Sequence, residues 1–182
     1  MSKLIFKPLA IATVTLLYCA TFAAAQGKHS SDAGIEVSKQ ATAKEVGLPL
    51  YPGAKPHKED SNETPSTKLG LWGGGFGFKL VVLKLESKDP ADKIAAFYQK
   101  ALAKYGKVLN CTSSDSHPET QDKKESNKIT CDEDKPDAGG MLYKSGTQDK
   151  QHIVEIKPAT NGLTVFTLLR METQGTEDKE AL

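Results

Sequence analysis

The sequence has little net charge, few aromatic residues and no long apolar run after residue 22. It holds 24 Lys and Arg against 23 Asp and Glu, and aromatic residues make up 7% of its 182 residues. A chain so balanced lacks the basic surface with which proteins bind nucleic acid or an anionic membrane. We therefore expect no nucleic-acid partner and no stable membrane span beyond the N-terminal segment.

The first 25 residues are typical of a cleavable secretory signal peptide. Two lysines give a positive start, residues 9–22 are mostly apolar but too short for a stable span, and residues 23–25 are small alanines that suit signal peptidase. An uncleaved anchor is disfavoured because no longer apolar run is present. Lipidation of Cys19 is disfavoured because the bulky Tyr18 precedes it. We expect cleavage after residue 25 and a periplasmic or secreted mature protein.

Cleavage there would leave 182 − 25 = 157 residues, the usual size of one domain with a sizeable core. Residues 26–38 are polar without periodicity, and we expect them to form a flexible lead-in. We expect residues 39–172 to form a single α+β domain, and the polar residues 173–182 to form a frayed tail.

Residues 90–106 are predicted to form the principal helix. Asp89 is a natural N-cap, Pro90 suits the first helical position and Gly106 suits the end. Apolar side chains recur at helical spacing in one stripe, which consists of Ile94, Phe97, Ala101, Leu102 and Tyr105. Lysines lie outside this stripe, so the helix should be amphipathic and should lie against a sheet.

Most of the remaining chain is predicted to form β-strands. They are expected at 69–72, 76–86, 107–112, 128–132, 141–145, 151–157 and 163–171, with hairpin turns between the last three. In the strand 76–86 the apolar alternation switches faces, which indicates a bulge or a strand covered on both faces. Runs of strands around one good helix predict an α+β fold with a mainly antiparallel sheet and the helix packed on it.

Cys111 and Cys131 are the only cysteines after residue 25, and two cysteines in an oxidising compartment most simply form a disulfide. A metal site with His117 and residues 132–134 is disfavoured, because zinc sites usually have cysteine pairs at tight spacing. The carboxylates of residues 132–137 leave open a divalent-cation site, although a solvated charged turn is the simpler interpretation. No cofactor is predicted.

No catalytic set emerges from the sequence. It has no Gly-x-Ser-x-Gly elbow, and three of its four histidines lie in expected loops. His152 lies in an expected strand, where a structural role is simpler than a catalytic one. The glycines at 73–75 run into a strand, which favours a turn over a phosphate-binding loop. An enzyme of unrecognised type, whose residues converge only in the fold, stays open as the alternative.

Four aromatic residues are candidates for a binding groove, namely Tyr51, Trp72, Tyr98 and Tyr105. Such rings combine a large apolar face with, in tyrosine and tryptophan, a polar group. Aromatic residues near the ends of elements more often close a core, and both interpretations stay open at this point.

Four segments resemble an uncharacterised family of small exported bacterial proteins. They are LPLYPGAKP (48–56), SKDPADKIAAFYQKALAKYGKVLNC (87–111), SGTQDKQHIVEIKP (145–158) and LTVFTLL (163–169). The family shares the Tyr-Pro-Gly-Ala segment, the helix with Phe-Tyr that ends in Tyr-Gly, and a closing hairpin. The resemblance covers most of residues 45–172 and implies a bacterial envelope location without implying an activity. We therefore expect an exported, non-enzymatic module that binds an envelope protein or a small ligand.

Overall fold

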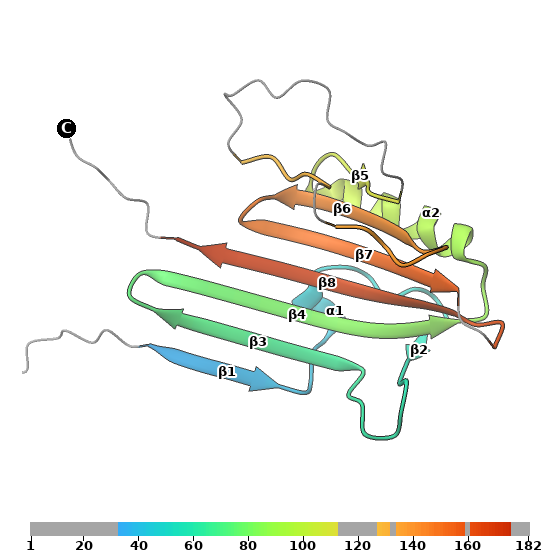
Figure 1. Cartoon of the computed structure of the whole chain (residues 1–182), viewed down its shortest axis with the longest axis horizontal. Coiled ribbons are helices and arrows are strands. Elements are labelled where there is room, and N and C mark those ends of the chain that lie inside the picture. The colour runs from blue at the N-terminus through green and yellow to red at the C-terminus, as the bar shows by residue number, and fades with distance from the viewer. Residues whose placement is uncertain (1–32, 113–126, 132–133, 159–160, 176–182) are drawn as a thin grey trace, which may run out of the picture. The chain divides into compact units, whose positions relative to one another are not determined.

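The computed structural model describes residues 33–112, 127–131, 134–158 and 161–175. In these residues eight strands pair antiparallel into one sheet in the order β1-β3-β4-β8-β7-β6-β5, and β2 pairs with β4 outside this path (Figure 1). The strands are β1 (Gly34–Ser38), β2 (Lys55–Pro56), β3 (Ser66–Gly73), β4 (Phe76–Ser87), β5 (Leu109–Asn110), β6 (Met141–Thr147), β7 (Lys150–Pro158) and β8 (Thr164–Gln174). The expected α+β class with a mainly antiparallel sheet is confirmed.

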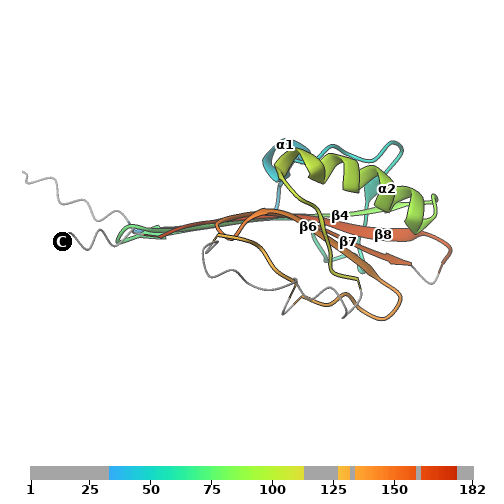
Figure 2. The ribbon, with the colours of Figure 1, turned by 90° about the horizontal axis from the view of Figure 1, so that it is seen from above.

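Two helices lie on one face of this sheet (Figure 2). They are α1 (Ala43–Val46) and α2 (Ala91–Leu102), and a short 3-10 turn, η1 (Ala103–Tyr105), continues α2. Their apolar side chains pack with those of β4, β6, β7 and β8 into one core, whose largest buried members include Tyr98, Phe166, Leu48, Ile94 and Leu102. The core therefore lies entirely on the helix side of the sheet.

Helix α2 begins one residue later than predicted, because Asp89 serves another contact. Pro90 is the N-cap and makes no side-chain capping hydrogen bond. The Asp89 carboxylate accepts a hydrogen bond from the Tyr51 hydroxyl at 2.5 Å and pairs with Lys93 at 2.9 Å. These contacts hold the pKa of Asp89 below its usual value, and they fasten the segment before β2 to the start of α2.

The buried stripe of α2 is rotated slightly from the predicted one. Leu102 is fully buried as predicted, but Tyr98 is also fully buried, whereas Phe97 is only partly buried. The Tyr98 hydroxyl accepts a hydrogen bond from the backbone N–H of Tyr51 at 3.2 Å, so the ring carries its polar group into the core with a partner. Burial raises the pKa of this hydroxyl well above its ordinary value.

Strand β4 is apolar on both faces over its middle. Its pairing with β8 runs unbroken from Gly77 to Ser87, so no bulge accompanies the predicted switch in alternation. Val81 and Leu83 face the helices and are buried. The alternate residues of 76–82 point to the opposite face, because side chains alternate along a strand. The switch therefore marks two apolar faces on one continuous strand.

A two-residue turn of Gly74 and Gly75 joins β3 to β4. Their φ angles of 59° and 84° are both positive, which glycine adopts at little cost and which matches the twist of a tight hairpin. The glycines thus form a hairpin turn and do not open a helix, as a phosphate-binding loop does.

Three other segments also differ from the predicted ones. Residues 34–38, which we placed in the flexible lead-in 26–38, form β1 and pair with β3. The polar tail does not begin at 173, because β8 stays paired with β4 as far as Gln174. Residues 128–131 form no strand, and the Thr130 carbonyl instead accepts a hydrogen bond from the Lys144 ammonium at 3.1 Å. Partners elsewhere in the chain decide these three differences, and local composition does not reveal them.

The packing of α2 predicts which substitutions on this helix destabilise the domain. Leu102→Ala should lower the free energy of unfolding by about 2–5 kcal/mol, because it leaves a cavity in the core. Lys100→Ala, on the exposed side of the same helix, should change it by less than about 0.5 kcal/mol. Urea unfolding followed by circular dichroism measures both. Similar losses in the two variants would contradict the packing described here.

Candidate binding surface

Part of the sheet extends beyond the region covered by α1 and α2 (Figure 2). We call this part the wing, and it consists of β1, residues 68–73 of β3, residues 76–80 of β4 and residues 171–174 of β8. Because side chains alternate along strands, the wing has two faces of different chemistry. The groove face continues the helix-covered side of the sheet, and the apolar face is the opposite one.

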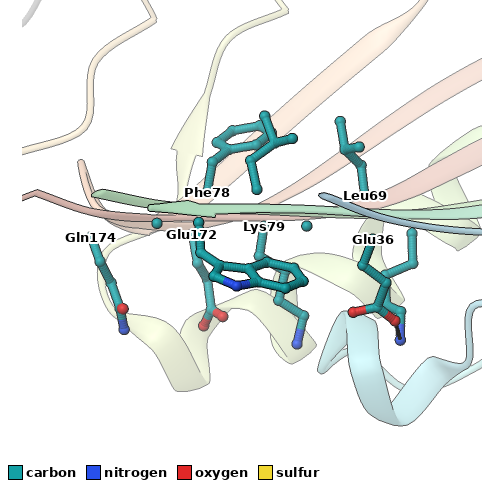
Figure 3. A pocket seen from close by; sticks show the side chains of 11 residues that line it. Glu36, Leu69, Phe78, Lys79, Glu172 and Gln174 are labelled. Carbon is teal, nitrogen blue, oxygen red and sulfur yellow. Dashed lines mark ion pairs between the residues drawn. The ribbon is translucent and has the colours of Figure 1, made fainter. Parts of the chain in front are cut away.

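A shallow groove of about 370 Å³ lies at the wing. Strand register aligns one row of Glu36, Gly70, Lys79 and Glu172, and a second row of Gly34, Trp72, Gly77 and Gln174. Figure 3 shows the polar side chains of Glu36, Lys79, Glu172 and Gln174 on one side of the sheet, opposite Leu69 and Phe78. The glycines between them keep the floor of the groove open.

The indole of Trp72 lies against the backbone of the neighbouring strand. A Cβ added at Gly34 would come within 2.4 Å of its six-membered ring, and one added at Gly70 would come within 3.6 Å of it. The ring therefore rests on the sheet where two glycines leave room, and 47% of the residue stays exposed. This arrangement presents an aromatic face to solvent on a rigid support.

Ion pairs neutralise most charges of the groove. Lys68 pairs with Glu36 at 2.7 Å and with Glu45 at 3.3 Å, and these contacts raise its pKa. Burial raises the pKa of Glu172, but its contacts with Arg170 and Lys150 outweigh this effect and lower the pKa overall. Both carboxylates of the groove are thus paired with cations.

Lys79 is different from the other cations of the groove. Within the described ranges its ammonium has no hydrogen bond or ion pair, although it lies between Gly70 and Glu172 in the register. It is half-buried and lies on the same face as Trp72. The groove therefore combines an aromatic platform with one cation that is available to an incoming group, which suits non-covalent recognition.

The structure separates the four aromatic residues that we considered for a groove. Tyr51 and Tyr98 are buried in the core, with ring centroids 6.5 Å apart. Tyr105 stacks on His152 with ring centroids 3.6 Å apart. Trp72 alone of the four lies on the wing, and its neighbours there are charged residues and glycines. The structure thus brings two of the four together, and it does so inside the core.

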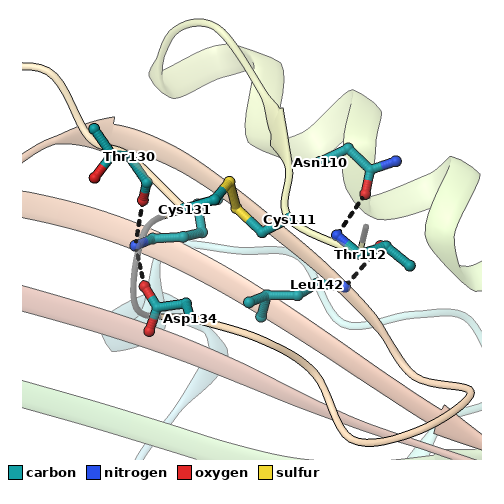
Figure 4. The surroundings of a disulfide bond; sticks show 8 residues. Asn110, Cys111, Thr112, Thr130, Cys131, Asp134 and Leu142 are labelled. Carbon is teal, nitrogen blue, oxygen red and sulfur yellow. Dashed lines mark hydrogen bonds and ion pairs between the residues drawn. A yellow bond between two sulfur atoms is a disulfide. The ribbon is translucent and has the colours of Figure 1, made fainter. Parts of the chain in front are cut away.

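Cys111 and Cys131 are joined by a disulfide, with their Cα atoms 5.3 Å apart (Figure 4). The bond places the segment around Cys131 beside β6. Lys144 of β6 is buried there, and its ammonium contacts Thr130 and the Asp134 carboxylate. The predicted pairing of the two cysteines is therefore present, and it holds a cover over the end of the sheet that lies away from the wing.

The carboxylates of the alternative cation site are only partly described. Asp132 and Glu133 lie outside the described residues. Asp134 pairs with Lys144, and Asp137 pairs with Lys157 at 2.6 Å, which lowers the pKa of Asp137. Within the described ranges, no three His, Cys, Asp or Glu side chains gather closely enough to hold a metal ion.

Ser145 and His152 form a buried polar pair on the helix-covered side of the sheet, where the Tyr105 ring stacks on His152. They are register partners on β6 and β7, and both are at most 1% exposed. Neither the Ser145 hydroxyl nor either ring nitrogen of His152 has a hydrogen-bond partner among the described residues. Burial lowers the pKa of His152 to about 4, and the positive charges of Arg170 and Lys150 add to this effect against the opposing charge of Glu172.

Trp72 was predicted from the sequence as a candidate groove residue. The other polar residues of the groove were not predicted, namely Glu36, Lys79, Glu172 and Gln174. These residues lie on three strands whose order in the sheet is not sequential. Alternation within each strand assigns faces to them, but only the register shows that they share one row or adjacent rows.

Comparison with protein-family models, with curated proteins and with solved structures finds no match. The resemblance to a family of exported bacterial proteins therefore stays a prediction. No helix among the residues described has the length and apolar character that a membrane crossing needs.

The disulfide between Cys111 and Cys131 leads to a testable prediction about the stability of the domain. In a chain of residues 26–182, the predicted mature protein, replacement of both cysteines by serine should lower the free energy of unfolding by about 3 kcal/mol, the amount expected for a loop of this length. Thiol titration of the oxidised, denatured mature protein should detect no free sulfhydryl. Two titratable thiols in protein taken from its native compartment would contradict the bond.

The buried His152 leads to a prediction about how the free energy of unfolding depends on pH. A folded-state pKa near 4 and an unfolded value near 6.5 mean that the unfolded chain binds the proton more readily between these pH values. Stability should therefore fall by roughly 2 kcal/mol as pH falls from 7 to 5. His152→Phe keeps a ring to stack on Tyr105 and should flatten this slope in urea unfolding. The same slope in the variant would show that another group causes it.

Proposed function

We propose that this chain is an exported, non-enzymatic binding module, and that its groove binds a saccharide that carries a carboxylate. The observation that carries the proposal is the Trp72 ring, which lies flat on a floor of glycines with about half of its surface open. An exposed aromatic face that lines a groove rimmed by polar side chains is typical of a ligand-binding site.

A sugar ring fits such a platform chemically. A pyranose presents a face of C–H groups, which pack on an aromatic ring, and a rim of hydroxyls, which need hydrogen-bond partners. The rim of the groove offers the Glu36 and Glu172 carboxylates as acceptors and the Gln174 amide as donor and acceptor. The hydroxyls of a bound sugar can therefore replace their hydrogen bonds to water with hydrogen bonds to these side chains.

The charge of Lys79 favours an acidic ligand over a neutral one. Glu36 and Glu172 are already paired with other cations, whereas the Lys79 ammonium has no partner in the described part of the chain. A ligand carboxylate that reaches Lys79 would form a charge-assisted hydrogen bond beside the aromatic platform. Saccharides with carboxylates are common in a cell envelope, which agrees with the expected export.

The sole tryptophan of the sequence is the proposed platform, so its fluorescence reports on the groove alone. N-acetylmuramic acid and N-acetylglucosamine are matched probes, because they differ by a lactyl group that bears the carboxylate. Titration of the mature protein with each should shift the Trp72 emission. We expect the acidic sugar to bind about fivefold more tightly, the gain expected from one exposed ion pair.

Variants separate the two contributions, with binding measured by calorimetry. Trp72→Ala should abolish binding of both sugars, and Lys79→Met should remove the preference for the acidic one. Gly77→Val should also block binding, because its side chain would stand on the groove floor beside Gln174. Leu50→Ala, which changes another half-exposed apolar residue, is the control and should bind normally. Binding that survives Trp72→Ala would overturn the proposed site.

A further inference from the structure

The apolar face of the wing consists of two aligned rows of side chains. One row is Ile35, Leu71 and Phe78, and the next is Val37, Leu69, Leu80 and Met171. Ile35 is 73% exposed and Val37 is 68% exposed. The core packs on the other side of the sheet, so this face has no cover among the described residues.

The face carries no charge over these rows. Its polar members in the register are Thr173, opposite Phe78, and Gln151, opposite Met171, and the Asp149 carboxylate lies at its border, 3.5 Å from the Thr173 hydroxyl. The first charged residue along β4 on this side is Lys84, which lies beyond Val82 and pairs with Glu59 and Glu63. A sheet that is apolar and uncharged on one face resembles the inner layer of a sandwich, which packs against a second sheet about 10 Å away.

After the predicted cleavage at residue 25, the rest of the chain has little apolar material with which to cover this face. Outside the described residues it comprises 26–32, 113–126, 132–133, 159–160 and 176–182, and Leu182 is their only large apolar residue. These segments therefore do not supply an apolar cover of comparable area. Contiguous apolar patches on folded proteins mark interaction sites.

We infer that the apolar face is the interface of a homodimer, in which two copies pack their sheets face to face. A second copy fits because the apolar rows themselves carry no charge, so two such faces can pack about a two-fold axis without placing like charges opposite each other within the rows. With the adjoining row of Val82, Leu169 and Ile153, it spans five strands and about seven residues, or roughly 24 Å by 23 Å. Two copies would bury about 1,100 Å² in total, which suffices for a weak but specific dimer.

Sedimentation velocity of the mature protein from about 1 to 200 μM tests this inference. We expect a monomer–dimer equilibrium, in keeping with the modest interface. Val37→Lys and Phe78→Lys should each raise the dimer dissociation constant at least tenfold, because a charge would be buried without a partner. Gln174→Lys adds the same charge to the groove face and is the matched control, which should dimerise normally.

Four outcomes would overturn the inference. They are a monomer at all concentrations, a dimer that both lysine variants leave unchanged, a dimer lost only in Val37→Lys, and association with lipid vesicles in place of self-association. The third would indicate pairing along the edge of β1 and not through the face. Circular dichroism checks that each variant is folded, and Val37→Lys alters a side chain that is already mostly exposed. The test does not involve the sugars, so its result is independent of the groove.

Discussion

The pairing of β4 with β3 and β8 fixes almost everything that we assign to binding. This twelve-residue strand is paired with β3 along its first part and with β8 over eleven positions. Its buried side chains anchor the helices on one side, and its continuation into the wing carries Lys79 towards the groove and Phe78 towards the apolar face. Because a shift of one residue exchanges the faces of a strand, this register decides which chemistry meets solvent.

Strand β4 gives the wing two different faces, because it does more than contribute apolar side chains to the core. A strand that only supported helices would need apolar residues on one face, as 81–85 provide. The extra alternation at 76–82 has no role in that core, and the same stretch holds Gly77 where a side chain would fill the groove. Binding and self-association would thus use opposite faces of one rigid layer. A dimer formed through the apolar faces would turn both grooves outward.

Local signals predicted the helix and most strands, since spacing and turn residues are visible along the chain. Leu102 followed from helical periodicity, but burial of Tyr98 depended on its contact with Tyr51, 47 residues away. Strand β1 was missed because GIEVS is short and follows a polar stretch, and only its pairing with β3 makes it a strand. The groove could not be predicted for the same reason, as Glu36 and Glu172 meet Lys79 through three separate strand pairings.

The disulfide has a consequence for when the fold can be completed. It joins positions separated by twenty residues and keeps the segment with Cys131 and Asp134 beside β6. In a reducing cytoplasm this bond does not persist, so Leu142 and Lys144 would lose their cover and that edge of the sheet would open more readily. If the chain is exported, as we propose, a precursor in this looser state would be easier to unfold for transport. Oxidation after export would then close this edge of the sheet.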